Sequence, residues 1–383
     1  MDLTLSDEQR LLRESVDRFV AETFNPEHRR RMTSEPLGFS RAVWKQFADL
    51  GWLALPIPES HGGLGGGAVE IGILMEAFGR GLVSEPYLST VVIGAALIAE
   101  CGSEGQKQAM LPKIADGSLH LAFAHSERAA RFDLGKVFTT AVKTSDGFKL
   151  NGHKTAVLDG SAAEQIIVSA RLDSDSGKPG KLRLFLVPSG TAGMTLQDFS
   201  RLGGGRACNL DLRDIHLPAE TLLGDGTDAL PAIECAVDRA MAALGAEAVG
   251  IMQTLLDATL EYTKMRKQFG RPLSANQVIR HRLADMAMHC DEARSMALRA
   301  ALRADAEPLA RSRAASGAKA KIGKCARFVA EQSVQLHGAM GVTEELDIGA
   351  YFKRLLAFDT LFGGSTHHYR RHAALGGRLT GHA

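Results

Sequence analysis

Apolar residues near the start of the chain recur with the period of an α-helix. Leu12, Val16 and Phe19 fall on one helical face, and Ser6 precedes Gln9 by three residues, the spacing of a capping box. The spacing therefore predicts an amphipathic helix that begins after Ser6. The same period predicts further helices at three places: 43–50, 68–79 and 90–101.

The apolar period changes to two from Leu119 onward, which is the period of a β-strand. Leu182, Leu184 and Leu186, for example, occupy every second position. Turn formers such as Asn151-Gly152 separate these short runs. We therefore predict an antiparallel sheet in the middle of the chain.

The helical period returns after Gly226 and holds through three long segments: 231–266, 275–304 and 308–335. These segments are rich in alanine and leucine and poor in aromatic residues, which is typical of helices packed in a bundle. The whole pattern predicts an α+β protein with three domains: an N-terminal α-helical domain over 1–118, a middle β-domain over 119–224 and a C-terminal helical bundle over 225–383.

Opposite charges nearly cancel over the 383 residues, with 45 Lys and Arg against 44 Asp and Glu. No global field attracts nucleic acid or an anionic membrane, so a bound anion must be recognised locally. The first residues, MDLTLSDEQR, lack the features of a signal peptide, and the longest apolar run, 91–99, is too short to span a membrane. We therefore expect a soluble, cytoplasmic protein. The five cysteines form no CxxC pair, and no metal site is expected.

A basic, amide-rich stretch joins the first two long helices. It reads YTKMRKQFGRPLSANQ and covers residues 262–277; we call it the elbow. Arg266 offers a planar guanidinium for bidentate contact with a phosphate, and Gln268 and Gln277 offer neutral amides. The alternative is a corner that simply faces water, because charged residues at helix ends complement the helix dipole. The residues alone leave both interpretations open.

The elbow resembles the signature with which acyl-CoA dehydrogenases hold FAD across a subunit boundary. Two further stretches resemble parts of the same family's flavin site, VQLHGAMGV at 334–342 and GGSTHHYRR at 363–371. The resemblance covers the whole chain and implies the acyl-CoA dehydrogenase fold, with a four-helix bundle at the C-terminus. It also implies that nine residues contact FAD: Arg266, Gln268, Phe269, Gln277, Gln335, Gly338, Ala339, Ser365 and His367.

The sheet region matches the family's flavin motif only in part. The stretch LAFAHSERAARFDL retains Ser126, whose hydroxyl would reach the edge of the isoalloxazine ring, with Phe123 and His125 beside it. Phe132 stands where the family usually has a serine that binds the pyrophosphate, and Ala156 stands where an aromatic residue commonly covers the flavin. These departures weaken the flavin pocket of this chain without abolishing it.

The base expected of the family is absent from its usual position. Most members carry a glutamate next to a glycine near the C-terminus, and this chain reads Phe362-Gly363-Gly364 there. Removal of a proton α to a thioester nevertheless needs a base of tuned pKa and a stabilised carbonyl oxygen. Either the base has moved or the subunit is inactive.

Two carboxylates on the first long helix are candidates for a relocated base. A branch of the family carries its base there in a Glu-Arg pair near the CoA, which Asp238 and Arg239 resemble, and Asp238 is our first choice. Glu247 is the second, because apolar neighbours such as Leu244, itself a predicted substrate contact, would raise its pKa. Asp238 near a helix start and Glu247 in a buried ion pair are the structural alternatives.

The segments DRAMAALGAEAVG and EYTKMRKQFGRPL look closest to the branch with the small subunit of pimeloyl-CoA dehydrogenase and the steroid side-chain enzymes. The resemblance implies an FAD-dependent enzyme that forms a trans-2-enoyl-CoA and passes electrons to an electron-transfer flavoprotein. It would be a homo- or heterotetramer. The alternatives are a non-catalytic subunit that completes another chain's FAD site, and a flavin oxidase or monooxygenase on the same fold.

Overall fold

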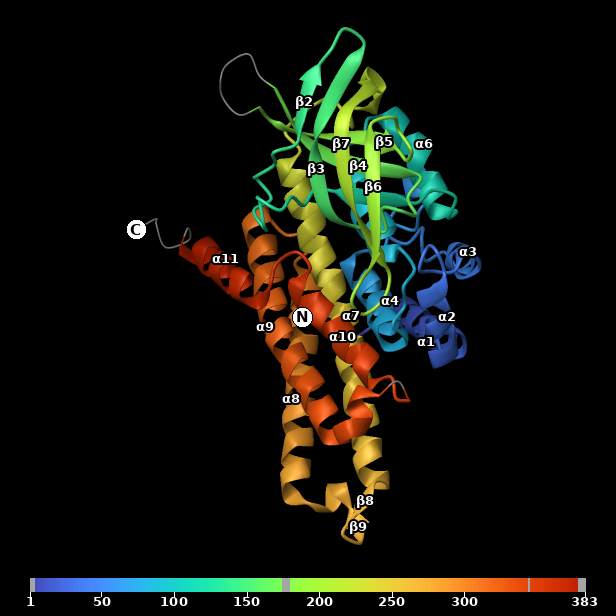
Figure 1. Ribbon diagram of the computed structural model, residues 1–383, viewed down its shortest axis with the longest axis vertical. Helices are drawn as coiled ribbons and strands as arrows, with labels where there is room; N and C mark the ends of the chain where they lie inside the picture. The colour runs from blue at the N-terminus through green and yellow to red at the C-terminus, as the bar shows by residue number, and fades with distance from the viewer. Residues whose placement is uncertain (1–3, 174–179, 344, 378–383) are drawn as a thin grey trace.

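The computed structural model describes residues 4–173, 180–343 and 345–377 of the chain. Helices, then a sheet, then long helices follow one another, which confirms the predicted α+β order (Figure 1). The N-terminal elements are α1 (Asp7–Thr23), α2 (Pro26–Ser34), α3 (Arg41–Asp49), η1 (Glu59–His61), α4 (Ala68–Gly81), the π-helical η2 (Tyr87–Ala95), α5 (Ala96–Cys101) and α6 (Glu104–Ala115). The predicted capping box is confirmed, because Gln9 N donates to Ser6 Oγ at 3.2 Å and Ser6 N donates to Gln9 Oε1 at 3.0 Å.

A sheet of seven strands follows in the described residues. The strands are β1 (Leu121–Ala124), β2 (Thr140–Lys143), β3 (Gly147–Leu158), β4 (Gln165–Leu172), β5 (Leu182–Pro188), β6 (Met194–Ser200) and β7 (Arg206–Pro218). Their order is β1-β4-β2-β3-β7-β6, and β5 pairs with β4. The predicted sheet is present and is mostly antiparallel, with antiparallel pairs β2–β3, β3–β7, β4–β5 and β6–β7, but β4 runs parallel to both β1 and β2. A period of two identifies a strand but carries no information about its partner.

The C-terminal part is a bundle built around one long helix. Its elements are η3 (Ala219–Thr221), α7 (Leu230–Met265), β8 (Lys267–Gln268), β9 (Arg271–Pro272), η4 (Leu273–Ala275), α8 (Gln277–Leu302), α9 (Pro308–His337), η5 (Gly338–Val342), α10 (Ile348–Thr360) and α11 (Ser365–Gly377). Helix α7 packs against α4, α8, α9 and α10, and α11 packs against α9. The predicted four helices are therefore present, and α11 is a fifth within the described residues.

Helix α7 links the bundle to the N-terminal helices through two glycines. A Cβ atom on Gly250 would lie 1.9 Å from Glu76 O, and one on Gly79 would lie 2.1 Å from Glu247 O. Only glycine permits such a close approach of α4 and α7. The sheet lies near one end of α7 and the elbow at the other, so these two parts of the chain are at opposite ends of the molecule (Figure 1).

Candidate functional site

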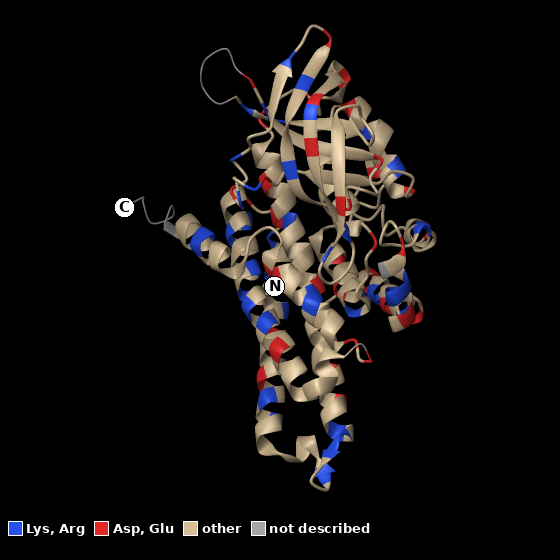
Figure 2. Cartoon of the chain, in the orientation of Figure 1, with Lys and Arg blue, Asp and Glu red and all other residues tan. Residues whose placement is uncertain are grey.

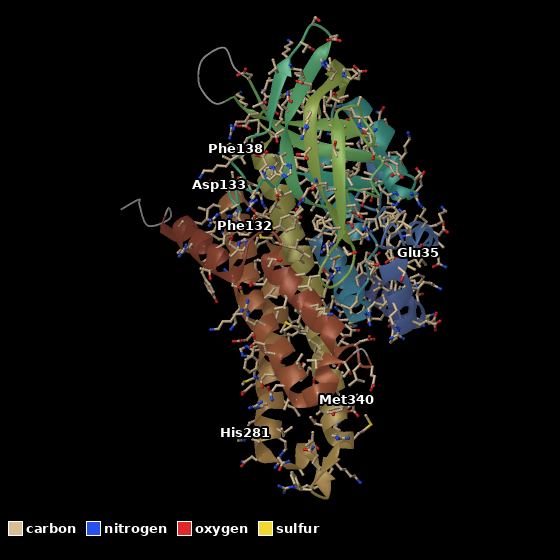
Figure 3. All side chains as sticks on the ribbon, in the orientation of Figure 1. Glu35, Phe132, Asp133, Phe138, His281 and Met340 are labelled. Carbon is tan, nitrogen blue, oxygen red and sulfur yellow. The ribbon has the colours of Figure 1, made fainter. Side chains whose placement is uncertain are left out.

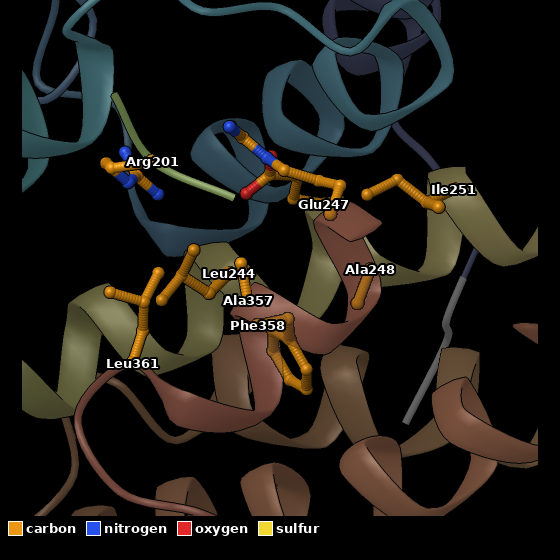
Figure 4. A pocket seen from close by; sticks show the side chains of 9 residues that line it. Arg201, Leu244, Glu247, Ala248, Ile251, Ala357, Phe358 and Leu361 are labelled. Carbon is orange, nitrogen blue, oxygen red and sulfur yellow. The ribbon is translucent and has the colours of Figure 1, made fainter. Parts of the chain in front are cut away.

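Three adjoining hollows lie between the sheet, η2, α7 and α10. The first hollow is lined by Ser89, Ile93, Phe123, His125, Ser126, Leu134, Ala156, Leu158, Val237 and Phe362. The second hollow shares Leu158 with the first, and its polar lining consists of Ser84, Glu85, Asp159, Arg201, Glu247 and Arg354. The third hollow shares Arg201, Leu244, Glu247 and Arg354 with the second. Figure 4 shows Arg201 and Glu247 in the wall of the third hollow, with Leu361 and Phe358 among its apolar side chains.

A buried ion pair fixes the loop after β1 that borders the first hollow. Lys154 Nζ, on β3, lies 2.7 Å from the carboxylate of Glu127, which also accepts hydrogen bonds from the backbone N–H groups of Phe138 (2.7 Å) and Thr139 (3.0 Å). Burial lowers the pKa of Lys154 to about 8 although Glu127 opposes the shift. Ser126 precedes Glu127, so the pair holds Ser126 at the edge of the hollow.

His125 enters the first hollow as a neutral ring. Its Nδ1 lies 2.9 Å from Ser169 Oγ, and its ring stacks on that of Phe123 with centroids 5.3 Å apart. Burial, and then the neighbouring Lys154 ammonium, lower the pKa of His125 to about 3. An imidazole with such a low pKa is a weak base at neutral pH.

The predicted flavin residues of the sheet region come together, whereas those near the C-terminus do not join them. Phe123, His125, Ser126 and Ala156 all line the first hollow. The ring of Phe132 is 43% exposed and lies 5.3 Å from the ring of His367, at the junction of the sheet and α11 (Figure 3).

Ser365 is engaged inside the chain. Its hydroxyl donates to Asp359 Oδ1 at 2.7 Å, and its backbone N–H donates to the same oxygen at 3.1 Å. These bonds fix the start of α11 and leave its hydroxyl committed within its own loop.

The elbow is a tight β-hairpin. Gln268 pairs with Arg271, and the two loop residues, Phe269 and Gly270, have φ values of 51° and 76°. Positive φ at both positions is the signature of a type I′ turn. The side chain of Phe269 is 101% exposed, and those of Arg266, Gln268 and Gln277 are exposed as well. Figure 2 shows that Lys and Arg positions gather along the chain at this end of the bundle.

The stretch 334–342, which contains Gln335 and the end of α9, lies beside the elbow. The ring of Tyr262, at the end of α7, stacks on the ring of His337 with centroids 4.3 Å apart, and Tyr262 Oη donates to His337 O at 3.3 Å. Gln335, Gly338 and Ala339 are exposed around this contact. Two stretches far apart in sequence therefore form one exposed surface, and it lies at the opposite end of α7 from the first hollow (Figure 1).

Asp238 points away from the first hollow, although Val237 lines it. Its Oδ2 lies 3.2 Å from Arg311 Nε and accepts from Ser312 Oγ at 2.7 Å, and its Oδ1 lies 3.1 Å from Arg371 Nη1. The side chain has no exposed surface. This geometry favours a structural role for Asp238, in which it joins α7 to α9 and α11.

Arg239, the arginine predicted to accompany the base, is also engaged with another residue. Arg239 Nη2 donates to Asp305 Oδ1 at 2.6 Å, at the loop between α8 and α9. It lines none of the three hollows. A contact between Arg239 and the CoA would require this ion pair to open.

The second candidate base, Glu247, lies in the second and third hollows with Leu244. Its Oε1 accepts hydrogen bonds from Arg354 Nε at 2.7 Å and Nη2 at 2.6 Å. No carboxylate lines the first hollow among the described residues. Both carboxylates proposed from the sequence are thus in buried ion pairs, which was the structural alternative for Glu247, whereas the alternative for Asp238 was a place near a helix start.

Gly363 offers no room for the usual glutamate. Its φ is 110°, and a Cβ atom would lie 2.7 Å from His367 Cδ2 and 3.0 Å from His368 Nε2. Lys319 Nζ donates to the carbonyl of Gly363 at 2.9 Å, which fixes the loop in this conformation. The loop between α10 and α11 is therefore shaped for glycine.

Three family models match consecutive parts of the chain. They describe the N-terminal domain of acyl-CoA dehydrogenase (residues 6–118), its middle domain (122–215) and its C-terminal domain (231–374). The probable acyl-CoA dehydrogenase YngJ of Bacillus subtilis is 33% identical over 356 residues, which cover 91% of this chain and 92% of that protein. The chain belongs to the acyl-CoA dehydrogenase family.

Other relatives and solved structures agree with this membership. The human mitochondrial short-chain specific acyl-CoA dehydrogenase is 32% identical over 321 residues, 82% of this chain and 77% of that protein. The ChsE4-ChsE5 complex of Mycobacterium tuberculosis superposes with a TM-score of 0.88 at 28% identity and full coverage of both chains. The Tcur3481-Tcur3483 steroid enzyme gives a TM-score of 0.87 at 29% identity, with 98% of this chain and 99% of that chain covered.

FAD is the cofactor that membership of the acyl-CoA dehydrogenase family implies, and the first hollow fits its ring. The walls formed by Ile93, Leu134 and Val237 are apolar, and the exposed Ser126 stands at the edge. The pyrophosphate finds no cation in this lining. The exposed Arg266 lies at the far end of the molecule (Figure 1). The described lining of the first hollow would thus hold the flavin ring but offers no phosphate contact.

The residues that sequence reasoning missed are those of the second hollow. Glu85 lies just before η2, Asp159 directly follows β3 and Arg201 begins the β6–β7 turn, and no linear spacing relates them. The sequence offers one signal, an arginine two residues before the glycine run 203–205.

A cluster of metal-ligating residues joins α8 to α9, although the sequence predicted no metal site. The ligand atoms of His289, Glu292 and Cys325 lie within 4.8 Å of one another. The Lys321 ammonium lies 2.7 Å from Glu292 Oε2 and supplies positive charge at that oxygen. Lys321 thus already supplies a positive charge to this cluster.

Among the helices described, none is both long and apolar enough to cross a membrane.

Proposed function

We propose that this chain is a subunit of an oligomeric, FAD-dependent acyl-CoA dehydrogenase and that its elbow completes the FAD site of a neighbouring subunit. The observation that carries the proposal is the exposed hairpin at the far end of α7. A wholly exposed phenylalanine three residues after an exposed arginine that forms no ion pair within the described residues is suited to an adenine ring and a pyrophosphate, because the first needs an apolar contact and the second a cation. The assembly would form a trans-2-enoyl-CoA and deliver electrons to an electron-transfer flavoprotein.

Within this assembly we assign no proton-abstracting base to this chain. Support comes from the first hollow, whose lining in the described residues lacks a carboxylate, and from the ion pairs that hold Asp238 and Glu247. This favours the site-completing role over catalysis by the chain alone. A partner subunit with its own carboxylate would then remove the α-proton.

The chain's own residues would bind and orient the flavin and the thioester. Bound FAD supplies the hydride acceptor of the reaction. Ser126 would donate its hydroxyl to the edge of the ring, and the apolar walls of the first hollow would keep water from the thioester. Arg266 and Phe269 would hold the neighbour's dinucleotide.

The elbow is tested by Arg266→Met, with Lys264→Met as the control. Both changes remove one cation, but Lys264 lies two residues earlier, in the last turn of α7, and pairs with Glu261 at 2.8 Å. Loss of a bidentate phosphate contact should weaken FAD binding to the assembly roughly tenfold or more, whereas Lys264→Met should change it little. Flavin fluorescence during FAD titration measures both. Equal FAD affinity in the wild type and in Arg266→Met would contradict the proposed role of the elbow.

A further inference from the structure

Arg201 is an arginine without a partner in the wall of two hollows. It begins the β6–β7 turn and lines the second and third hollows. Among the described residues, its guanidinium forms no hydrogen bond or ion pair. Burial, and then the nearby Arg354, lower the pKa of Arg201 to about 10, while Asp159 and Glu247 oppose the shift. The guanidinium is thus charged and has donors to spare.

Glu85 presents a free oxygen to the same second hollow. The residue is 6% exposed, and its Oε1 accepts one long hydrogen bond, from Ser40 N at 3.4 Å. Its buried Oε2 has no partner among the described residues. Burial raises the pKa of Glu85 to about 7, so its carboxyl group is present in both protonation states at neutral pH. It can donate as well as accept a hydrogen bond.

The other charged groups of the second hollow already have partners. Arg354 binds Glu247 and also donates to Val83 O at 3.2 Å. Asp159 Oδ2 accepts from Ser89 Oγ at 2.6 Å. Free hydrogen-bonding capacity is therefore concentrated on Arg201 and Glu85. Buried polar groups are almost always paired, and an unpaired one costs free energy, so this arrangement indicates a missing polar ligand.

The second hollow adjoins the first, in which the proposed function places the thioester. Leu158 lines both the first and second hollows, and Ser89 of the first hollow bonds to Asp159 of the second. Apolar side chains of the third hollow, including Leu244 and Phe358, flank the route (Figure 4). An acyl chain that starts in the first hollow and passes Leu158 would end at Arg201.

We propose that the second and third hollows form the far end of the acyl chamber and take an acyl group whose distal end carries an oxygen acceptor, either a carboxylate or a ketone. The Arg201 guanidinium and the Glu85 carboxyl group would bind that oxygen, and Leu244 and Phe358 would contact the hydrocarbon. The inference rests on the proposed function, because it places the thioester in the first hollow. It assigns a substrate class that an apolar chamber would exclude.

Calorimetric titration of the purified chain, with FAD present in excess, tests the substrate class. The three probes are octanoyl-CoA, its ω-carboxy analogue suberyl-CoA, and an oxo-octanoyl-CoA with the ketone next to the terminal methyl group. We expect at least one oxygen-bearing probe to bind roughly tenfold more tightly than octanoyl-CoA, because charge-assisted hydrogen bonds are the strong ones. The two oxygen-bearing probes distinguish a carboxylate from a ketone.

Two variants test whether Arg201 causes the preference for the oxygen-bearing probes. Arg201→Met should abolish the preference, and Arg206→Met should retain it, because Arg206 lies in the same turn but bonds Asp198 Oδ2 at 2.7 Å and lines none of the hollows. If Arg201→Met does not fold, Glu85→Leu removes the other half of the site and should lower the preference several-fold.

The outcomes separate this inference from the proposed function. Binding of all three probes with equal affinity, or of octanoyl-CoA most tightly, would overturn the polar chamber and leave the family function intact. A preference that survives Arg201→Met would overturn it as well. Failure of every acyl-CoA to bind would overturn both the proposed function and the inference.

Discussion

At the scale of single residues, the role of Asp238 depends on the buried charged groups around it. Two arginines and a serine surround its carboxylate, so we predict that Asp238→Ala lowers the free energy of unfolding by about 3–5 kcal/mol, because it leaves Arg311 and Arg371 without a countercharge. Urea denaturation measures this. The matched control is Asp305→Ala, since Asp305 is 70% exposed and pairs with Arg239 at the surface; it should cost about 0–1 kcal/mol. Equal stability of the two variants would contradict the structural role.

A second prediction at this scale concerns pH and Glu85. Burial raises the pKa of Glu85 from 4.5 to about 7, so between these values the folded state keeps a proton that the unfolded chain has released. The stabilisation from this group is complete below the lower value and is lost as pH rises through the higher one. The Glu85→Gln variant cannot ionise at this position and should lose none of this stabilisation over that interval.

The comparison is made with urea midpoints at about pH 5 and about pH 8. Relative to Glu85→Gln, the wild type should lose roughly 3 kcal/mol or less between the two conditions. Because every other titrating group is common to both proteins, their difference isolates Glu85. Parallel pH profiles would show that Glu85 is ionised in the folded protein throughout.

The sequence predicted single residues of the candidate site where a linear motif contained them. Ser126, Arg266 and Gln335 each stood inside a short stretch that the family writes in similar form. Arg201 and Glu85 did not, because a sheet turn and the start of η2 meet only in the folded chain. The ion-pair partners of Asp238 could not be predicted from the sequence either, which is why Asp238 was proposed as a base.

At the scale of elements, helices were easier to predict than strand partners. The long apolar period of α7 gave its extent to within one residue at each end, since a 36-residue helix repeats its pattern many times. The short strands β2 and β6 escaped notice; β6 is mostly exposed and therefore has no strong alternation. The hairpin in the elbow, only two residues on each side, was interpreted as a simple corner.

The loop between α10 and α11 yields the third prediction. Gly363→Glu should not create a working base, because the new Cβ would meet His367 and the backbone φ suits glycine. We expect it to lower the free energy of unfolding by more than about 1 kcal/mol and to add no acyl-CoA-dependent loss of flavin absorbance. Gly364→Ala is the control, since its nearest contact would be 3.4 Å from Asp359 O. Rapid bleaching by the glutamate variant would show that the loop can adapt.

At the scale of the molecule, the length of α7 separates two functional surfaces. The first hollow lies beside the sheet and the elbow lies at the other end of the bundle (Figure 1). A single chain therefore cannot use its own elbow on its own hollow. The proposed function therefore predicts association with another subunit, and the exposed Phe269, Met265 and Val342 at the elbow end suit burial in such a contact.

The central claim is that this chain completes a flavin site without supplying the base. Anaerobic addition of acyl-CoAs to the purified, FAD-loaded chain, followed at the flavin absorbance band near 450 nm, tests it most directly. The account predicts that the chain alone binds acyl-CoA but does not bleach, and that bleaching appears when the subunit co-purified from its native host is added. Full bleaching by the chain alone, with either acyl-CoA class, would contradict it.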